Sequence, residues 1–277
     1  MQLAGLVTDT ALDEISGIAA SRRRDDLLWV IDDSGNPARL YALSKRGRRL
    51  GTFEIEGVDK VDWEDMASFE LDGERYLLIA DTGDNGGIRK LLQIHIFREP
   101  DDADTDGTLK PEWSIDFRWP DGARDCEAVA VDAEQNEIIL ISKKRQPPQV
   151  FTLPLRPRGN GPKIETAALS GTLAGVPQAS ARERRDNPAV ARLRSQVTAA
   201  DIAPQRDAIA VLTYDNLLVY QRKPDQSWPQ ALASAPDIVR LRFLPQAEAV
   251  AWSHGGGGIY ASGEFNPAPL MYLRYAR

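Results

Sequence analysis

The chain has few of the residues on which most catalytic and metal centres are built. It contains one cysteine and two histidines among 277 residues. The single cysteine, Cys126, excludes an internal disulfide and any cysteine-ligated zinc or iron–sulfur centre. The two histidines, His95 and His254, leave little room for a histidine-rich metal site. Carboxylates are therefore the groups most available for chemistry.

Positive charge and long apolar runs are also scarce. The chain has 34 Lys and Arg against 41 Asp and Glu, a net charge of −7, which argues against a general nucleic-acid binder. No apolar run approaches the roughly 18 residues of a membrane span. No signal peptide is evident, so we expect a cytoplasmic protein, or a periplasmic or secreted one whose leader has been trimmed. We also expect a monomer.

The sequence instead contains a repeat of about fifty residues. Five similar segments have a polar first residue, then small and apolar residues; they begin at Glu14, Glu64, Glu127, Thr198 and Glu248. Each is followed by an apolar strand with a polar end, near Asp32, Asp81, Ser142, Thr213 and Ser262. Third strands are predicted at 39–43, 91–97, 149–153, 217–222 and 270–275, and fourth strands at 50–56, 112–118, 164–170 and about 229–234.

Strands rich in Val, Ile, Tyr and Leu that repeat at this period predict the four-stranded blades of an all-β propeller. We expect one domain, 1–277, with blades at about 14–60, 64–120, 127–175, 198–240 and 248–277. The N-terminal strand 2–9 would complete the last blade and close the ring. The prediction is five blades, with six as the alternative if 171–197 contains a degenerate unit.

The propeller topology separates the charges onto two faces. Blade entries and the loops between second and third strands share one face, and the two hairpins of each blade share the other. The first face collects the blade-start glutamates together with Asp32 and Asp81. The opposite face collects Arg22, Arg23, Arg24 and neighbouring basic residues, with His254. We therefore expect one acidic channel mouth and one basic face.

Carboxylates that converge on a channel repel one another unless a cation, protons or basic groups lie between them. Calcium takes about six to eight oxygen ligands of this kind. The candidate calcium ligands are Glu14, Glu64, Glu127, Glu248, Asp32 and Asp81. Glu64 and Glu127, from different blades, are the candidates for general acid and base. The alternative is structural, with each glutamate capping backbone N–H groups of the next blade.

A basic triplet, Lys143, Lys144 and Arg145, falls on the acidic face. It is a candidate to hold a phosphate or carboxylate beside a metal, and a solvated charged loop is the alternative. The arginine-rich segment 174–197 is a long blade connection, and connections of this length are often lids or binding loops. A short helix over the mouth and simple disorder both fit its sequence.

The segments EISGIAAS, DWED, DTGDN, RDCEAVAVD and AEAVAW together resemble uncharacterised bacterial propellers near the phytase-like, gluconolactonase-like and NHL-like groups. The resemblance implies calcium bound at the channel mouth and hydrolysis of phosphate esters or lactones. It would make Glu14, Glu64, Glu127 and Glu248 the metal-proximal set. Five blades are fewer than those enzymes use, and Thr198 replaces the glutamate of the fourth blade.

Two hypotheses follow for function. The first is a calcium-assisted hydrolase that acts on a small-molecule phosphate ester or lactone, with water activated by the metal as nucleophile. The second is a non-catalytic scaffold that binds a protein or carbohydrate ligand over the same face. The fold alone does not choose between them.

Overall fold

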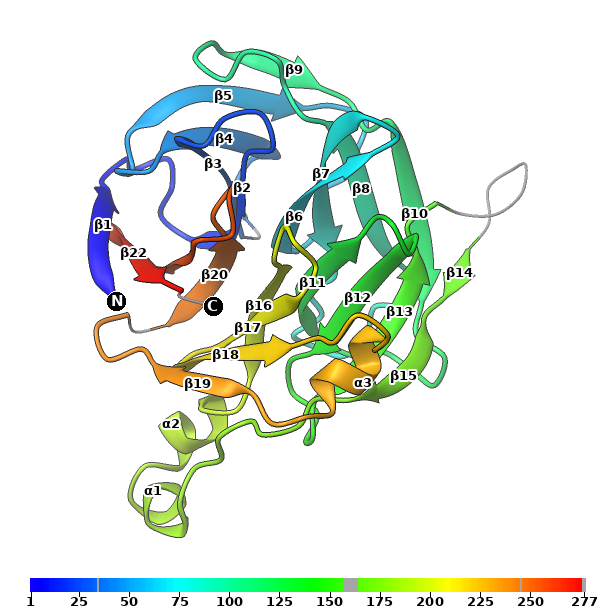
Figure 1. The fold of residues 1–277 in the computed structure, drawn as a ribbon, viewed down its shortest axis with the longest axis vertical. Coiled ribbons are helices and arrows are strands. Elements are labelled where there is room, and N and C mark those ends of the chain that lie inside the picture. Colours follow the sequence, from blue (N-terminus) through cyan, green and yellow to red (C-terminus); the bar gives the residue numbers. More distant parts are fainter. Residues whose placement is uncertain (34, 157–163, 245, 276–277) are drawn as a thin grey trace.

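The apolar strands pair in sequence order into five sheets that surround a central axis (Figure 1). The computed structural model describes residues 1–33, 35–156, 164–244 and 246–275. The innermost strand of each sheet contacts the innermost strands of its two neighbours, so the ring is continuous. The predicted five-bladed propeller is confirmed.

The first three blades each consist of four antiparallel strands in chain order. Blade one contains β2 (Ile15–Ala20), β3 (Leu27–Asp32), β4 (Arg39–Ser44) and β5 (Arg49–Ile55). Blade two contains β6 (Trp63–Leu71), β7 (Glu74–Asp81), β8 (Leu92–Arg98) and β10 (Trp113–Arg118). Blade three contains β11 (Cys126–Asp132), β12 (Glu137–Ser142), β13 (Gln149–Pro154) and β15 (Ala168–Thr172).

The last two blades complete the ring. Blade four contains β16 (Val197–Ile202), β17 (Ala208–Thr213), β18 (Asn216–Gln221) and β19 (Asp237–Arg240). Blade five contains β20 (Ala247–Trp252), β21 (Gly258–Gly263) and β22 (Ala268–Arg274). Its outer strand is β1 (Gln2–Val7), which pairs antiparallel with β22 as predicted (Figure 1). The two ends of the chain thus join in one sheet, which removes two free sheet edges.

The six-blade alternative is wrong. Residues 171–197 contain the end of β15 and two short helices, α1 (Ala181–Asp186) and α2 (Pro188–Leu193), in place of a degenerate blade. No helix in the described ranges is long and apolar enough to cross a membrane.

The predicted fourth strand of blade four, at about 229–234, is also wrong. Helix α3 (Trp228–Leu232) occupies this segment. Ser227 Oγ accepts from Gln230 N, and the Gln230 side chain accepts from Ser227 N. This capping box, with a proline in the first turn, favours a helix over a strand. The blade is completed later in the chain, by β19.

Two short strands connect neighbouring blades: the repeat did not predict β9, and β14 is the first part of the strand predicted at 164–170, which the structure divides into β14 and β15. β9 (Gly107–Leu109) belongs to blade two in sequence but pairs parallel with β5 of blade one. β14 (Glu165–Thr166) belongs to blade three but pairs parallel with β10 of blade two. Strands of two or three residues carry too little periodicity to be recognised in a sequence.

The hydrophobic core consists of five clusters, each filling the space between two adjacent blades. Trp29 of blade one and Met66 of blade two, both fully buried, belong to the same cluster. Because a blade packs against neighbours on both sides, strands β2, β3, β11, β16, β17, β20 and β21 are buried along their whole length. This explains why they are almost continuously apolar rather than alternating.

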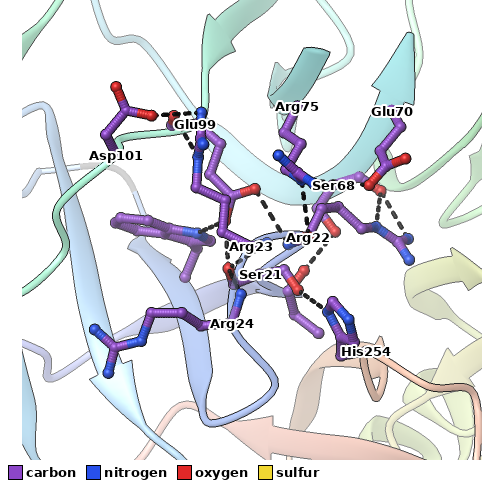
Figure 2. A network of polar contacts seen from close by, with 12 residues as sticks. Ser21, Arg22, Arg23, Arg24, Ser68, Glu70, Arg75, Glu99, Asp101 and His254 are labelled. Carbon is purple, nitrogen blue, oxygen red and sulfur yellow. Dashed lines mark hydrogen bonds and ion pairs between the residues drawn. The ribbon is translucent and has the colours of Figure 1, made fainter. Parts of the chain in front are cut away.

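Part of the predicted basic face is structural. Glu99, which is 1% exposed, accepts hydrogen bonds from Ser21 Oγ, Arg22 N and Trp29 Nε1. This network joins the first hairpin of blade one to blade two (Figure 2). Nearby, Arg23 pairs with Asp101 on the same face. A buried carboxylate with several donors holds two blades together here.

Candidate functional site

The acidic mouth is built on five equivalent β-bulges. The pairing register shifts at the start of every innermost strand. The extra residues are Ser16, Glu64, Glu127, Thr198 and Glu248. A bulge leaves one residue unpaired in the ladder and redirects its side chain. The same backbone irregularity therefore sets one side chain per blade at the channel mouth.

The structure corrects the alignment of the first repeat. Ser16, not Glu14, occupies the position of Glu64, and Glu14 lies two residues earlier. Glu14 is exposed, and its carboxylate accepts from Asn36 Nδ2 at 3.2 Å. The five equivalent positions, predicted to hold four glutamates and Thr198, therefore hold three glutamates, one serine and one threonine. Thr198 Oγ1 donates to Ala247 O of the next blade at 2.7 Å, so this position connects two blades.

Glu64 is the centre of the carboxylate cluster. It is 7% exposed, and no described residue donates a hydrogen bond to it or forms an ion pair with it. One oxygen of Glu64 lies within 4.8 Å of oxygens of Asp33 and Asp62, and a second group within the same distance joins Glu64 to Asp125 and Glu127. Burial, together with the charges of Glu127, Asp33 and Asp62, raises the pKa of Glu64 well above its ordinary value. The charge of Lys143 opposes this in part. A buried carboxyl without a hydrogen bond from the described residues therefore lies inside a group of five.

Gly83 provides the space that these carboxylates occupy. A Cβ built on Gly83 would overlap with Glu64 Oε1 and Asp62 Oδ2. The glycine of the DTGDN segment therefore does more than form a turn, since any larger residue would displace two carboxylates of the cluster.

Two lysines of the predicted basic triplet lie against the cluster. Lys143 is 7% exposed, forms an ion pair with Glu127, and lies 5.2 Å from the ring centre of Tyr214. Burial raises the pKa of Glu127 to about 8, although Lys143 opposes this. Lys144 Nζ lies 2.7 Å from Asp125 Oδ2 and donates to Asn85 Oδ1. Arg145 is exposed, so the triplet divides into two paired lysines and one solvated arginine.

Glu248 lies on the blade-five side of the mouth, outside both carboxylate groups. Burial, followed by a hydrogen bond to Glu264, raises the pKa of Glu248 to about 10. This favours a carboxyl that shares a proton with Glu264 at neutral pH. Its predicted role as a metal ligand stays a prediction.

The two aspartates at the ends of second strands differ from each other. Asp81 accepts from Val61 N and Asp62 N and forms a 2.7 Å ion pair with Arg89, so both its oxygens have partners. Asp32 is 1% exposed, and its carboxylate has no hydrogen-bond partner among the described residues. Burial raises the pKa of Asp32 to about 7, with Lys60 opposing. Neither belongs to the two carboxylate groups, and their roles as ligands stay predictions.

Three members of the cluster, Asp33, Asp62 and Asp125, were not among the predicted ligands. Asp62 and Asp125 each lie two residues before a bulged glutamate, which gives the pattern Asp-x-Glu in blades two and three. Glu14 precedes Ser16 by the same interval. The recurrence of Asp-x-Glu at blade starts is the sequence signal that could have identified two of them.

A cavity of about 670 Å³ lies between the mouth and the helices α1 and α2. The helices project from the ring beside blade four (Figure 1). The polar side chains that line the cavity are Asn85, Lys143, Lys144, Gln146, Gln178, Arg184, Arg192, Ser195, Gln196 and Tyr214. Four of these are cations and none is a carboxylate. Lys143 and Lys144 face both the cavity and the carboxylate cluster.

The α1–α2 segment is fixed to the ring by named contacts. Ser180 and Glu183 form a capping box at the start of α1. Arg194 pairs with Glu183 at 2.9 Å and with Asp215 of blade four at 3.1 Å. The sequence left helix and disorder open for 174–197, and the structure has two short helices there.

Comparison with known proteins gives no family for this chain, so the fold is assigned from its strand topology. No family model matches the sequence, and no curated protein matches it. Among solved structures, the chain is similar to the β-propeller domain of Cps50 (Swd1) from Myceliophteria thermophila, with 10% identity and a TM-score of 0.45. The match covers 95% of this chain and 84% of that chain. The predicted relation to phytase-like, gluconolactonase-like or NHL-like propellers stays a prediction, and the chain itself is a five-bladed β-propeller.

Proposed function

We propose that the acidic mouth binds a divalent cation, calcium first of all, together with an anionic small molecule held in the adjoining cavity. The observation that carries this proposal is Glu64, a carboxylate that is 7% exposed and lacks any hydrogen bond or ion pair from the described residues. A buried carboxylate is unfavourable unless it is protonated, paired or bound to a metal. Two groups of carboxylates that share Glu64 offer the third solution.

The donor set favours calcium over transition metals. Asp33, Asp62, Glu64, Asp125 and Glu127 present only oxygen, which hard cations prefer, whereas zinc and copper prefer histidine and cysteine. Gly83 leaves the space that Glu64 and Asp62 occupy. Bound there, calcium would supply Lewis-acid polarisation of a phosphoryl or carbonyl oxygen.

The cavity supports an anionic ligand. Lys143, Lys144, Arg184 and Arg192 give it four positive charges, and its volume of about 670 Å³ is in the range of small-molecule sites. The amides of Gln146, Gln178 and Gln196 add groups that suit hydroxyls. Hydrolysis of a phosphate ester or lactone is the catalytic form of this proposal, with Glu64 and Glu127 as the carboxylates nearest to the reacting group.

A second candidate function is a scaffold that binds a protein or carbohydrate over the same face. It is favoured by exposed apolar side chains in the loops around the mouth, namely Val61, Ile88, Leu91, Val190, Phe243 and Phe265. Ile88 and Phe243 are each 78% exposed. Apolar side chains gathered on one face often mark a protein interaction site.

The test is calcium binding by calorimetry after treatment with EDTA, with the melting temperature as a second readout. We expect calcium to bind and stabilise the wild-type protein and Glu14→Gln, because Glu14 is an exposed carboxylate of the same face outside the cluster. Glu64→Gln should lose most of both effects. Absence of calcium binding, or equal loss in the two variants, would refute the metal site.

The hydrolytic part has its own test. Wild-type protein is assayed on a panel of phosphomonoesters and lactones with calcium and with EDTA. Metal-dependent turnover that Glu127→Gln abolishes is the expected result. If calcium binds and no member of the panel is turned over, the catalytic form is refuted and the binding function stands. Capture of a partner that Ile88→Ser with Phe243→Ser abolishes would favour the scaffold.

A further inference from the structure

A second cavity, of about 310 Å³, lies at the opposite end of the channel. Every blade contributes to it from its innermost strand or first hairpin: Arg22, Phe69, Val131, Ile202 and His254 come from blades one to five in turn. All five first hairpins lie on the face opposite the acidic mouth, so this cavity covers the other opening of the channel.

The floor of the cavity is apolar. Phe69, Val131 and Ile202 are 4%, 8% and 4% exposed, and Ala203 and Pro204 extend the same surface. An apolar floor with a few convergent polar groups is the usual composition of a small-molecule site.

Arg22 is held in place at the rim and forms no ion pair within 4.0 Å in the described chain, although its charge acts on the buried carboxyl of Asp201. Its Nε and Nη2 both donate to Ser68 O, at 3.1 and 2.8 Å (Figure 2). Its backbone is fixed too, since Arg22 N donates to Glu99 and Arg22 O accepts from Arg75 Nε. Nη1 is left without a hydrogen bond from the described residues. The neighbouring Arg23, by contrast, has Asp101 as partner.

His254 approaches the same rim from blade five. Its Nδ1 lies 2.8 Å from Ser21 O (Figure 2). A carbonyl can only accept, so Nδ1 carries the proton, and Nε2 of the neutral ring is left as a hydrogen-bond acceptor.

The acidic residues at the rim are compensated. Glu70 lies 3.4 Å from Arg75, and Glu134 pairs with Arg206. Arg206 is engaged further by Asp132. Asp201 is 6% exposed and accepts from Trp252 N, so it is screened from the cavity. The charge at this cavity that lacks a direct ion pair is therefore the positive charge of Arg22.

We propose that this cavity binds a carboxylate that bears an aromatic or branched apolar group, either as a free acid or as the C-terminal residue of a peptide. The carboxylate would accept from Arg22 Nη1, and the apolar group would cover Phe69, Val131 and Ile202. An arginine already fixed by other bonds loses little freedom on binding. The site shares no residue with the acidic mouth, so the two proposals stand or fall separately.

The test is a titration followed by calorimetry or by NMR chemical shifts, with phenylacetate as the probe and phenylacetamide as its neutral match. We expect the amide to bind about tenfold more weakly or worse, because it lacks the charge-assisted hydrogen bond. Arg22→Gln should lower phenylacetate affinity by a similar factor, and Arg22→Lys should retain part of it. Arg23→Gln, on the same hairpin but outside the cavity, is the control. Melting temperatures confirm that each variant is folded.

The source of the carboxylate is tested with an acetylated dipeptide that ends in phenylalanine, with a free or an amidated C-terminus. Tighter binding of the free-acid peptide than of phenylacetate assigns the site to peptide C-termini, and weaker binding assigns it to free acids. Equal affinity for phenylacetate and phenylacetamide, equal loss in Arg22→Gln and Arg23→Gln, or no binding of either acid would overturn the proposal.

Discussion

Two consecutive carboxylates of β6 have opposite surroundings. Asp65 is fully buried and accepts from Met66 N, Val129 N and Ala200 N at 2.9, 2.9 and 3.1 Å. Those donors belong to blades two, three and four. Glu64 is nearly as buried but has no hydrogen bond from the described chain. The bulge at Glu64 separates the two side chains, so one points into the ring and the other lies at its mouth.

This difference in hydrogen bonding indicates a structural role for Asp65 and makes Glu64 the candidate ligand. Burial raises the pKa of Asp65, and three N–H donors oppose it. The unfavourable burial of Asp65 is offset by bonds that connect three blades across the channel. Glu64 accepts no hydrogen bond from the described residues, and only the charge of Lys143 is seen to oppose its raised pKa. A buried carboxyl with so little compensation is typical of a ligand site.

The largest expected effect comes from removing the structural carboxylate, Asp65. Asp65→Ala would leave three buried N–H groups without an acceptor, and we expect it to lower the free energy of unfolding by about 4 kcal/mol or more. Chemical denaturation measures this. A loss below about 1 kcal/mol would show that the interblade bonds are dispensable.

Asp201 has more hydrogen-bond support than Glu64 and less than Asp65, since its carboxylate accepts from Trp252 N at 2.7 Å. Burial raises the pKa of Asp201 from 3.8 to about 7, with Arg22 opposing. Between these two values the unfolded chain binds fewer protons than the folded one, so the free energy of unfolding falls as the pH rises from about 4 to about 7.

Asp201→Asn should remove this part of the pH dependence. As the pH rises from about 4 to about 7, the free energy of unfolding of the variant should fall by on the order of 3 kcal/mol less than that of the wild type. Denaturant unfolding at both pH values measures the difference. Parallel pH profiles for the two proteins would contradict the prediction.

Gly83→Ala tests the space around the functional carboxylate. The added Cβ overlaps with Glu64 Oε1 and Asp62 Oδ2, so we expect calcium affinity to fall about tenfold or more. Gly86→Ala is the matched control, because a Cβ there meets nothing nearer than 3.6 Å. Equal calcium affinity in Gly83→Ala and Gly86→Ala would contradict this prediction.

Glu64→Gln gives the smallest effect and the sharpest contrast with Asp65→Ala. Without calcium, loss of an uncompensated buried charge should leave stability unchanged or raise it by up to about 1 kcal/mol. Thermal melting with EDTA measures this. Destabilisation comparable to that of Asp65→Ala would make Glu64 structural as well.

Much of the fold could be predicted from the repeat, because blades are local units of consecutive strands. The strand predicted at about 229–234 is wrong because the capping box at Ser227 favours helix α3 there over the repeat pattern. Glu14 was placed at the mouth because sequence similarity cannot reveal which residue bulges. The role of Gly83 could not be predicted, because the overlap of an added Cβ with Glu64 and Asp62 depends on side-chain positions that the repeat does not specify.

The sequence by itself predicted five blades, with six as the alternative, together with the closure of the ring and the gathering of acidic residues at one mouth. These follow from periodicity and topology, which are properties of the chain order. Only the tertiary structure decided which carboxylates are compensated, because compensation depends on contacts between blades. The Asp65 bonds to Val129 and Ala200 join separate blades, and the two carboxylate groups around Glu64 bring together residues of blades one, two and three.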